Sequence, residues 1–231
     1  YILVYRYYTN IYVLSDLFKN PIKINEKYLG RNPKIAIFNG NYFFVIYTCY
    51  LTKTTTSSIC IRTFNGTHQG NTEEFLSEDV SSHLIDNATM EYFDFPSDDE
   101  VSANIVWVSS LGKSTTIEGV MLTINVQNSI VYTLTNIYEI YQNQKFQASP
   151  KFVTDSVTSI FFVVWEEISQ NNLTNISLKG QILNKNRIKT CPVIEISSFS
   201  GINQVNPSVA FSNNKFLVVW SSFGQDTDGF G

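Results

Sequence analysis

The stretch Ile160-Phe161-Phe162-Val163-Val164-Trp165 decides the fold, because it is apolar at consecutive positions and ends on a large aromatic residue. A strand that has one face in water alternates apolar and polar residues, whereas an uninterrupted apolar run is typical of a strand that is buried on both faces. The stretch therefore predicts a central β-strand with another layer packed on each side.

The same pattern recurs along the chain. The other copies are Tyr42 to Tyr47, Ala103 to Trp107 and Lys215 to Trp220. The four closing aromatic residues, Tyr47, Trp107, Trp165 and Trp220, follow one another at spacings of 60, 58 and 55 residues, and Tyr5 is a candidate for an earlier copy 42 residues before Tyr47. Such a period indicates one supersecondary unit repeated in tandem.

Three copies share an opening element with a proline, which precedes the closing aromatic residue by 14, 15 and 13 positions. The three elements are Asn32-Pro33-Lys34-Ile35-Ala36, Ser149-Pro150-Lys151-Phe152-Val153 and Asn206-Pro207-Ser208-Val209-Ala210. Proline has no N–H group, so we expect each strand to start just after its proline. Residues typical of turns follow, at Asn39-Gly40-Asn41, Asp155-Ser156 and Ser212-Asn213-Asn214, and lead into the central strand.

Further strands complete each unit. We expect third strands over Ser58 to Phe64, Val120 to Val126 and Ser177 to Leu183, and fourth strands over Ile130 to Thr135 and Ile188 to Ser197. Only residues Asn71 to Leu84 could hold a short helix, with Asn71 and Glu74 as its capping pair.

These elements predict an all-β chain, a β-propeller-like repeat of four-stranded antiparallel blades that belongs to a larger ring or array. The predicted units are a partial blade at 1–31, blades at 32–88, 89–148 and 149–205, and a partial blade at 206–231, with both ends expected to be cuts in a longer polypeptide. Tandem β-sandwiches are the alternative fold; they explain the strands but not the period.

Composition excludes several classes of protein. With 43% hydrophobic and 16% charged residues the chain is expected to fold rather than to be disordered. A net charge of −4 and the lack of any Lys/Arg cluster longer than two residues argue against binding to nucleic acid. The longest apolar stretch, Tyr42 to Leu51, is about ten residues long, which is too short to span a membrane as a helix.

The last unit runs from Asn206-Pro207-Ser208-Val209-Ala210-Phe211 through Val218-Val219-Trp220 to Gln225-Asp226-Thr227-Asp228-Gly229. It resembles a repeat family of large secreted and surface proteins, chiefly bacterial, with a Pro-initiated strand, a strand ending in Val-Trp and a Gln-Asp-x-Asp-Gly loop. The resemblance is good over 206–229, fair over 149–183, and weak over 32–64 and 90–126, where the acidic loop is absent. It implies an extracellular, propeller-like, structural or adhesive module and no enzyme.

Two acidic clusters are candidates for binding a metal ion. Asp226 and Asp228 precede Gly229 with the spacing by which short loops offer oxygen ligands to Ca²⁺, so calcium is the cofactor considered. Alternatively, both are turn residues that bind their own backbone. The second cluster, Asp98-Asp99-Glu100, is expected to cap a solvated loop.

The cysteines and the glycosylation sequons bear on the compartment. A hairpin through Thr54-Thr55-Thr56 would bring Cys49 opposite Cys60, which predicts a disulfide and an oxidising compartment. Two buried thiols in a cytosolic propeller are the alternative, and Cys191 is left unpaired in either case. Sequons begin at Asn65, Asn87, Asn172 and Asn175; all four are expected in loops or connectors, Asn65 and Asn87 most clearly.

Support for catalysis is poor. The two histidines, His68 and His83, lie in a polar connector, and no phosphate-binding loop or zinc spacing occurs. Glu166 and Glu167 follow Trp165, where propeller glycosidases use carboxylates at strand ends, but no second carboxylate pairs with Glu166 at a predictable distance. The recurring aromatic residues could form a sugar-stacking platform, although packing between blades explains better why every copy has one.

The sequence thus favours a non-enzymatic extracellular or cell-surface protein, structural or adhesive, that contributes to a surface or filament-like assembly. Its expected partners are other protein chains or copies of itself, with glycans second. The alternatives are a carbohydrate-binding or glycoside-hydrolysing β-propeller, and an intracellular scaffold propeller in which Cys49 and Cys60 are reduced.

Overall fold

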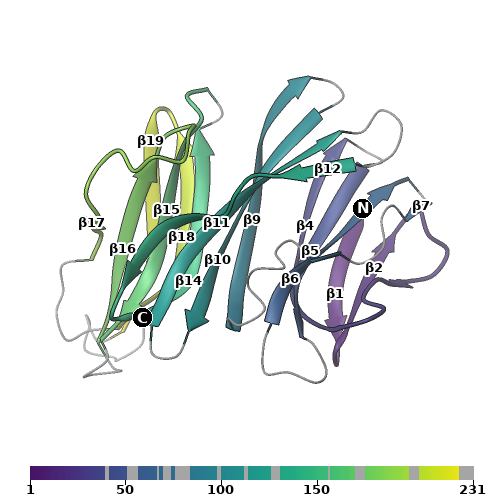
Figure 1. Ribbon diagram of the computed structural model, residues 1–231, viewed down its shortest axis with the longest axis horizontal. Helices are drawn as coiled ribbons and strands as arrows, with labels where there is room; N and C mark the ends of the chain where they lie inside the picture. Colours follow the sequence, from purple (N-terminus) through teal and green to yellow (C-terminus); the bar gives the residue numbers. More distant parts are fainter. Residues whose placement is uncertain are drawn as a thin grey trace. The chain divides into compact units, whose positions relative to one another are not determined.

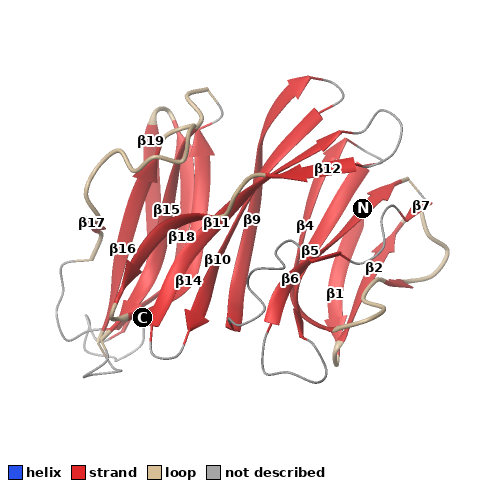
Figure 2. Cartoon of the chain, viewed as in Figure 1, coloured by secondary structure: helices blue, strands red, loops and turns tan. Residues whose placement is uncertain are grey.

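The computed structural model describes residues 1–39, 42–50, 57–66, 68–69, 74–75, 84–97, 100–111, 114–125, 131–155, 157–169, 175–197 and 203–223. All regular elements in these residues are β-strands, and the strands pair antiparallel wherever the pairing is described (Figure 2). The all-β prediction is confirmed. Within the same ranges there is no helix of the length and hydrophobicity needed to cross a membrane.

The chain divides into two compact units. The first comprises Tyr1–Ile105 and Val120–Asn136, and the second comprises Val106–Gly119 and Ile137–Gly231. The first unit holds a three-stranded sheet and a five-stranded sheet (Figure 1). The sheets are β1 (Ile2–Tyr7), β2 (Asn10–Ser15) and β3 (Ile22–Lys23), and then β4 (Leu29–Asn39), β5 (Tyr42–Tyr50), β6 (Ser57–Asn65) and β7 (His68–Gln69), with β8 (Glu74–Phe75) also on β6.

Two long strands run through both units. They are β10 (Glu100–Leu111) and β11 (Ser114–Asn125), in the sheet order β12-β11-β10-β9, where β9 is Leu84–Ser97 and β12 is Val131–Leu134. In the second unit β13 (Tyr138–Asn143) pairs with β11. The other strands of that unit are β14 (Phe146–Asp155), β15 (Ile160–Ile168), β16 (Ile176–Leu183) and β17 (Ile194–Glu195), in this order, and the hairpin β18 (Asn203–Ser212) and β19 (Lys215–Phe223).

The prolines lie inside strands and do not start them, so that part of the prediction is wrong. β4, β14 and β18 each begin four residues before the proline, and the ladder of each strand skips the proline and the residue before it. The preceding residues, Asn32, Ser149 and Asn206, have φ of 50°, 51° and 55°. Each pair is thus a β-bulge, which tolerates both the left-handed residue and the missing N–H.

The register explains why the proline and the closing aromatic residue recur together at similar spacings. Arg31 pairs with Thr48 and Lys34 with Ile46, which leaves Asn32 and Pro33 opposite Tyr47 alone. By the same count the bulge in β14 lies opposite Trp165, and the bulge in β18 lies opposite Trp220. The proline and the aromatic residue are therefore the two sides of one cross-strand feature.

The central strands β5 and β15 are buried on both faces, as the consecutive apolar residues predict. On β15, Phe161, Val163 and Trp165 join the core formed with β10, β11 and β13. The next residue along, Phe162, lies on the other face and packs against Phe216 of β19, with ring centroids 5.2 Å apart. The side chain of Phe162 also needs Gly180 on β16, because a Cβ there would lie 2.5 Å from its ring.

Three smaller expectations are corrected. Tyr5 closes no central strand, because β1 is the outer strand of its sheet and β2 lies in the middle. The fourth strand expected over 188–197 reduces to β17 and a single bridge from Lys189 to Leu183. In the range allowed to a helix, Glu74 and Phe75 form a strand, and most of the other positions lie outside the described residues.

Candidate functional site

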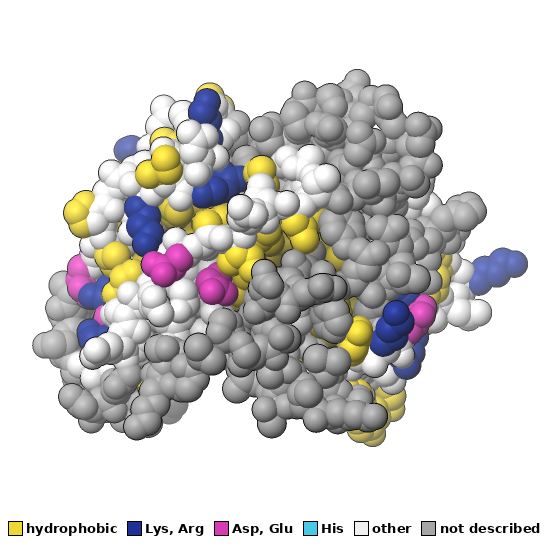
Figure 3. Space-filling model, viewed as in Figure 1, with side chains coloured by type: hydrophobic (Ala, Val, Ile, Leu, Met, Phe, Trp, Pro, Cys, Tyr) yellow, Lys and Arg dark blue, Asp and Glu magenta, His cyan; other side chains and the backbone are white. Residues whose placement is uncertain are grey.

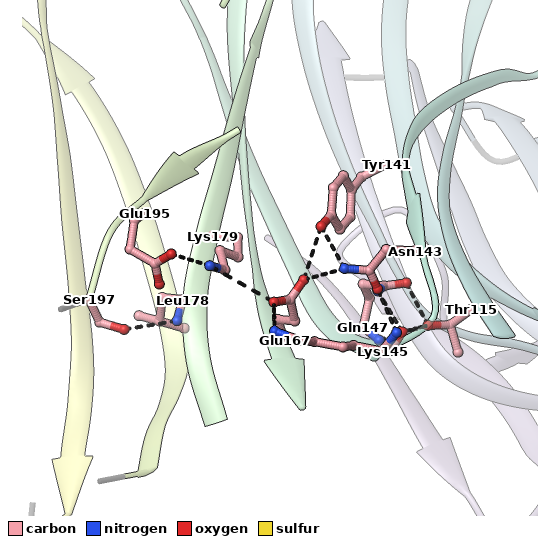
Figure 4. Close-up of polar contacts among 10 residues, drawn as sticks. All are labelled: Thr115, Tyr141, Asn143, Lys145, Gln147, Glu167, Leu178, Lys179, Glu195 and Ser197. Atoms are coloured by element: carbon pink, nitrogen blue, oxygen red, sulfur yellow. Dashed lines mark hydrogen bonds and ion pairs between the residues drawn. The ribbon is translucent and has the colours of Figure 1, made fainter. Parts of the chain in front are cut away.

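Glu167 lies at the centre of a polar cluster in the second unit (Figure 4). Successive residues of a strand point to opposite faces, so Glu167 shares a face with Val163 and Trp165 whereas Glu166 does not. The carboxylate continues the row of core residues on that face, and its side chain is only 2% exposed. A charge at such a position requires partners.

Three donors and a second cation surround the Glu167 carboxylate. Tyr141 Oη and Asn143 Nδ2, both on β13, donate to Oε2 at 3.1 and 2.8 Å. Lys145 Nζ, from the turn before β14, donates to Oε1 at 2.8 Å, and Lys179 Nζ on β16 lies 3.9 Å from the same oxygen. These contacts offset the cost of removing the carboxylate from water.

The pKa values in the cluster follow from these contacts. Burial raises the pKa of Glu167, but the hydrogen bond and charge of Lys145, together with the bonds from Tyr141 and Asn143, outweigh burial and hold the pKa below its ordinary value. Burial and the neighbouring Glu167 charge raise the pKa of Tyr141 to about 12. At neutral pH the pair is a fixed carboxylate and a fixed phenol donor, and neither group is poised to exchange a proton.

A second layer of bonds fixes the donors. Asn143 Oδ1 accepts from the backbone N–H of Lys145 at 2.6 Å and from Gln147 Nε2 at 2.8 Å. Gln147 also donates to the carbonyl of Lys145 at 2.6 Å, and its Oε1 accepts from Thr115 Oγ1 at 2.6 Å. The turn that carries Lys145 is thereby held from both sides.

Lys179 connects the buried carboxylate to the surface. Its ammonium forms an ion pair with Glu195 on β17, whose side chain is 52% exposed, so two carboxylates share one cation. Beside it, Ser197 accepts from the backbone N–H of Leu178 at 2.9 Å. On the visible face, the described Lys, Arg, Asp and Glu side chains are interspersed (Figure 3), which fits the low net charge.

Glu166 has a different role. It points to the other face of β15, is 6% exposed, and accepts the backbone N–H of Asn206 at 2.7 Å. Asn206 is the left-handed residue of the bulge in β18, where the ladder is interrupted, so the carboxylate satisfies an N–H that the bulge leaves over. Glu166 and Glu167 therefore cannot flank the same substrate bond.

The partners of Glu167 are not among the residues predicted from the sequence. One signal could have indicated them, since Tyr141, Asn143, Lys145 and Gln147 are polar at alternate positions, as residues on one face of an extended chain are. Nothing in the sequence says that this face meets β15.

Three of the four recurring aromatic residues are packed in the core, as predicted, and Trp220 is exposed. Tyr47, Trp107 and Trp165 are at most 1% exposed, and Trp220 is 37% exposed. Trp107 donates its indole N–H to Glu118 at 3.0 Å, and Trp220 donates to Gln204. The indole N–H of Trp165 is buried with no hydrogen-bond partner among the described groups.

The predicted disulfide is confirmed. Cys49 on β5 and Cys60 on β6 are bonded, with Cα atoms 5.8 Å apart, and both are buried in the core of the first unit. Cys191 is a free, partly exposed thiol.

The sequons have different surroundings. Asn65 is exposed at the end of β6 and is followed by Gly66, which has a φ of 57° and open space around it. Asn87 lies within the 14-residue strand β9 and not in a loop, which corrects the expectation. Asn175 directly precedes β16, and Asn172 lies outside the described residues.

The metal candidates are not described. Asp226, Asp228, Asp98 and Asp99 lie outside the described residues, as does His83, whereas His68 lies in β7. Where the structure is described, no three His, Cys, Asp or Glu residues are grouped so that they could hold a metal ion.

No family model and no curated protein matches this chain. Among solved structures, the crystal structure of an exo-1,5-α-L-arabinanase from a bovine ruminal metagenomic library is similar, with 10% sequence identity and a TM-score of 0.48 over 99% of this chain and 89% of that chain. The likeness is too slight to carry the function of that enzyme over to this chain.

Proposed function

We propose that this protein is a non-enzymatic extracellular module, structural or adhesive, built from β-propeller-like blades. The observation that carries the proposal is that the residues recurring from repeat to repeat serve packing. The bulged proline lies opposite the aromatic residue in three copies, and the aromatic residues Tyr47, Trp107 and Trp165 are buried. In a structural array each repeat is stabilised by packing on its neighbours, so recurring residues that serve packing fit such a role.

The sheet order supports the blade-like part of the proposal. In β4-β5-β6-β7 and in β14-β15-β16-β17 the chain moves by one strand at a time across an antiparallel sheet. The blades of propellers are four-stranded antiparallel sheets in this order, which β14 to β17 match, whereas the first sheet has β8 on β6 as a fifth strand.

The disulfide supports the extracellular part of the proposal. Bonds of this kind persist in oxidising compartments and are rare in the cytosol. Asn65 fits the same compartment, because it is exposed beside a glycine with open space around it and could carry a glycan.

Carbohydrate binding or glycoside hydrolysis is the second candidate function, and one observation favours it. Glu167 and Glu195 both approach Lys179, beside the phenol of Tyr141, so two carboxylates lie close together at one edge of the second unit. Against it, Glu167 is occupied by Tyr141, Asn143 and Lys145, and its pKa is lowered, whereas a general acid needs a raised pKa.

Secretion of the 231-residue chain from eukaryotic cells tests the proposal. Non-reducing peptide mapping should give a Cys49–Cys60 peptide, and hexose mass should appear on the Asn65 peptide and disappear in Asn65→Gln. Two free thiols together with an unmodified Asn65 would favour the intracellular scaffold instead. Release of reducing sugar from polysaccharides by the wild type, lost in Glu167→Gln, would favour the enzyme.

A further inference from the structure

At three places where the packing is described, consecutive sheets stack with the same polarity. We call the face of a central strand that carries the closing aromatic residue its upstream face, and the opposite face its downstream face. On β15 the upstream residues Phe161, Val163 and Trp165 pack on strands that precede β15 in the chain. The downstream residues Phe162 and Glu166 contact Phe216 and Asn206, which follow it.

The first unit has the same polarity. The upstream residues of β5, Phe43, Val45 and Tyr47, lie in one core with Ile11 and Val13 of β2. In both units, therefore, the upstream face of a sheet covers the downstream face of the sheet before it in the chain.

The downstream face of the hairpin β18–β19 is apolar and exposed. The repeat spacing of 55 residues places Leu217 and Val219 where β15 has Phe162 and Val164. Phe162 and Val164 are buried, whereas Leu217 is 62% and Val219 is 53% exposed, and Phe223 on the same face is 43% exposed. These three residues carry the apolar pattern of a covered face.

The upstream face of the sheet β1–β3 is apolar as well. Ile11 and Val13 occupy its downstream face, so Leu3, Tyr5, Tyr12 and Leu14 lie on the other. Leu3 pairs with Leu14 and Tyr5 with Tyr12, and the two tyrosine rings stack at 5.5 Å. Leu3 is 50% exposed.

We propose that two copies of this chain associate head to tail, with Leu217, Val219 and Phe223 of one copy packed on Leu3, Tyr5, Tyr12 and Leu14 of the other. A second copy is the occupant because the contact repeats, with the same polarity, the one that consecutive sheets already make within the chain. The two surfaces differ from each other, so the contact is heterologous and can be repeated by further copies. This inference rests on the proposed structural role and names its partner.

Face-blocking variants test the association. Leu217→Glu with Val219→Glu places charge on the downstream face, and Leu3→Glu with Leu14→Glu places charge on the upstream face. Val157→Glu is the matched control, because Val157 is 90% exposed in the turn between β14 and β15, on neither face. All substitutions are at partly or fully exposed positions, and circular dichroism checks that each variant is folded.

Analytical ultracentrifugation over a wide range of concentration gives the readout. We expect the wild type and Val157→Glu to form species larger than dimers as concentration rises. Each face-blocked variant alone should stay monomeric, and an equal mixture of the two should stop at the dimer, since it has one intact pair of faces.

The proposal is overturned if the wild type is monomeric at its highest soluble concentration, or if either face-blocked variant still self-associates, which would indicate a symmetric contact. The disulfide and glycan mapping does not depend on association. A monomeric wild type would therefore not contradict the proposed extracellular compartment, and free thiols at Cys49 and Cys60 would not contradict the association.

Discussion

Glu167 joins three strands and a turn through one carboxylate. Its partners come from β13, from the turn before β14 and from β16, so a single side chain sets how these elements meet. A buried charge with this many donors is costly to disturb, because the donors would lose their acceptor as well.

We expect Glu167→Gln to lower the free energy of unfolding by about 1–3 kcal/mol at neutral pH. The amide of Gln is neutral and has one acceptor oxygen, so it cannot replace the carboxylate as acceptor for all of these donors. The pKa of Glu167 in the folded chain lies below its ordinary value of 4.5. Its stabilising effect is therefore present above pH 4.5 and is lost as the pH falls through the folded pKa. Urea titrations at neutral pH and below that pKa should show the difference between variant and wild type shrinking in acid.

Glu195→Gln is the control, because Glu195 belongs to the same cluster but is 52% exposed. An exposed pair contributes less than about 1 kcal/mol, so this variant should have a small effect. Equal effects of the two substitutions, or a Glu167→Gln effect that is independent of pH, would contradict the role assigned to Glu167.

The sequence indicates some of these residues and not others. Glu166 and Glu167 are identifiable because they interrupt an apolar pattern, and Cys49 and Cys60 because a hairpin separates them. The donors to Glu167 are not identifiable, because Tyr141 and Asn143 lie 26 and 24 residues away on a strand whose register carries no signal in the sequence.

Among the elements, the β18–β19 hairpin has the most exacting turn. Ser212 pairs with Lys215, so the loop has two residues, and Asn213 and Asn214 have φ of 50° and 59°. Positive φ at both positions is the type I′ geometry, for which Asn-Gly is the preferred sequence.

We expect Asn214→Gly to raise the melting temperature and to add about 0.5 kcal/mol to the free energy of unfolding, because glycine adopts positive φ without steric cost. Asn214→Ala should lower that free energy by about 1 kcal/mol, since alanine has neither this freedom nor the local hydrogen bonds of Asn. Both Asn residues are exposed, so lost contacts do not complicate the comparison. An alanine variant as stable as the wild type would rule out the type I′ turn.

At the scale of elements, the sequence predicts the central strands well and the prolines poorly. The uninterrupted apolar runs predict β5 and β15 as strands buried on both faces, and both are. Pro33, Pro150 and Pro207 could stand at a strand start or in a β-bulge, because neither position needs a hydrogen bond from the proline nitrogen. Only the register of the neighbouring strand distinguishes the two.

At the scale of the whole molecule, the repeat predicts stacked sheets but not the division into two compact units. The division passes through β10 between Ile105 and Val106, and through β11 between Gly119 and Val120. The residues on either side of each division are uncharged, and neither strand has a glycine- or proline-rich stretch there, so the sequence does not mark the division.

The disulfide lies in the first unit, and that gives a test of how independently the two units are stabilised. Replacing both Cys49 and Cys60 by alanine removes the constraint on the 11-residue separation between them, and we expect a loss of about 2–3 kcal/mol. Hydrogen exchange read by mass spectrometry should show protection falling in β4, β5 and β6 while β14, β15 and β16 keep theirs, because the disulfide closes a loop of the first unit only. Cys191→Ala, which removes a free thiol, should change neither set. An equal loss of protection in both sets would mean that the long strands β10 and β11 make the two units unfold as one.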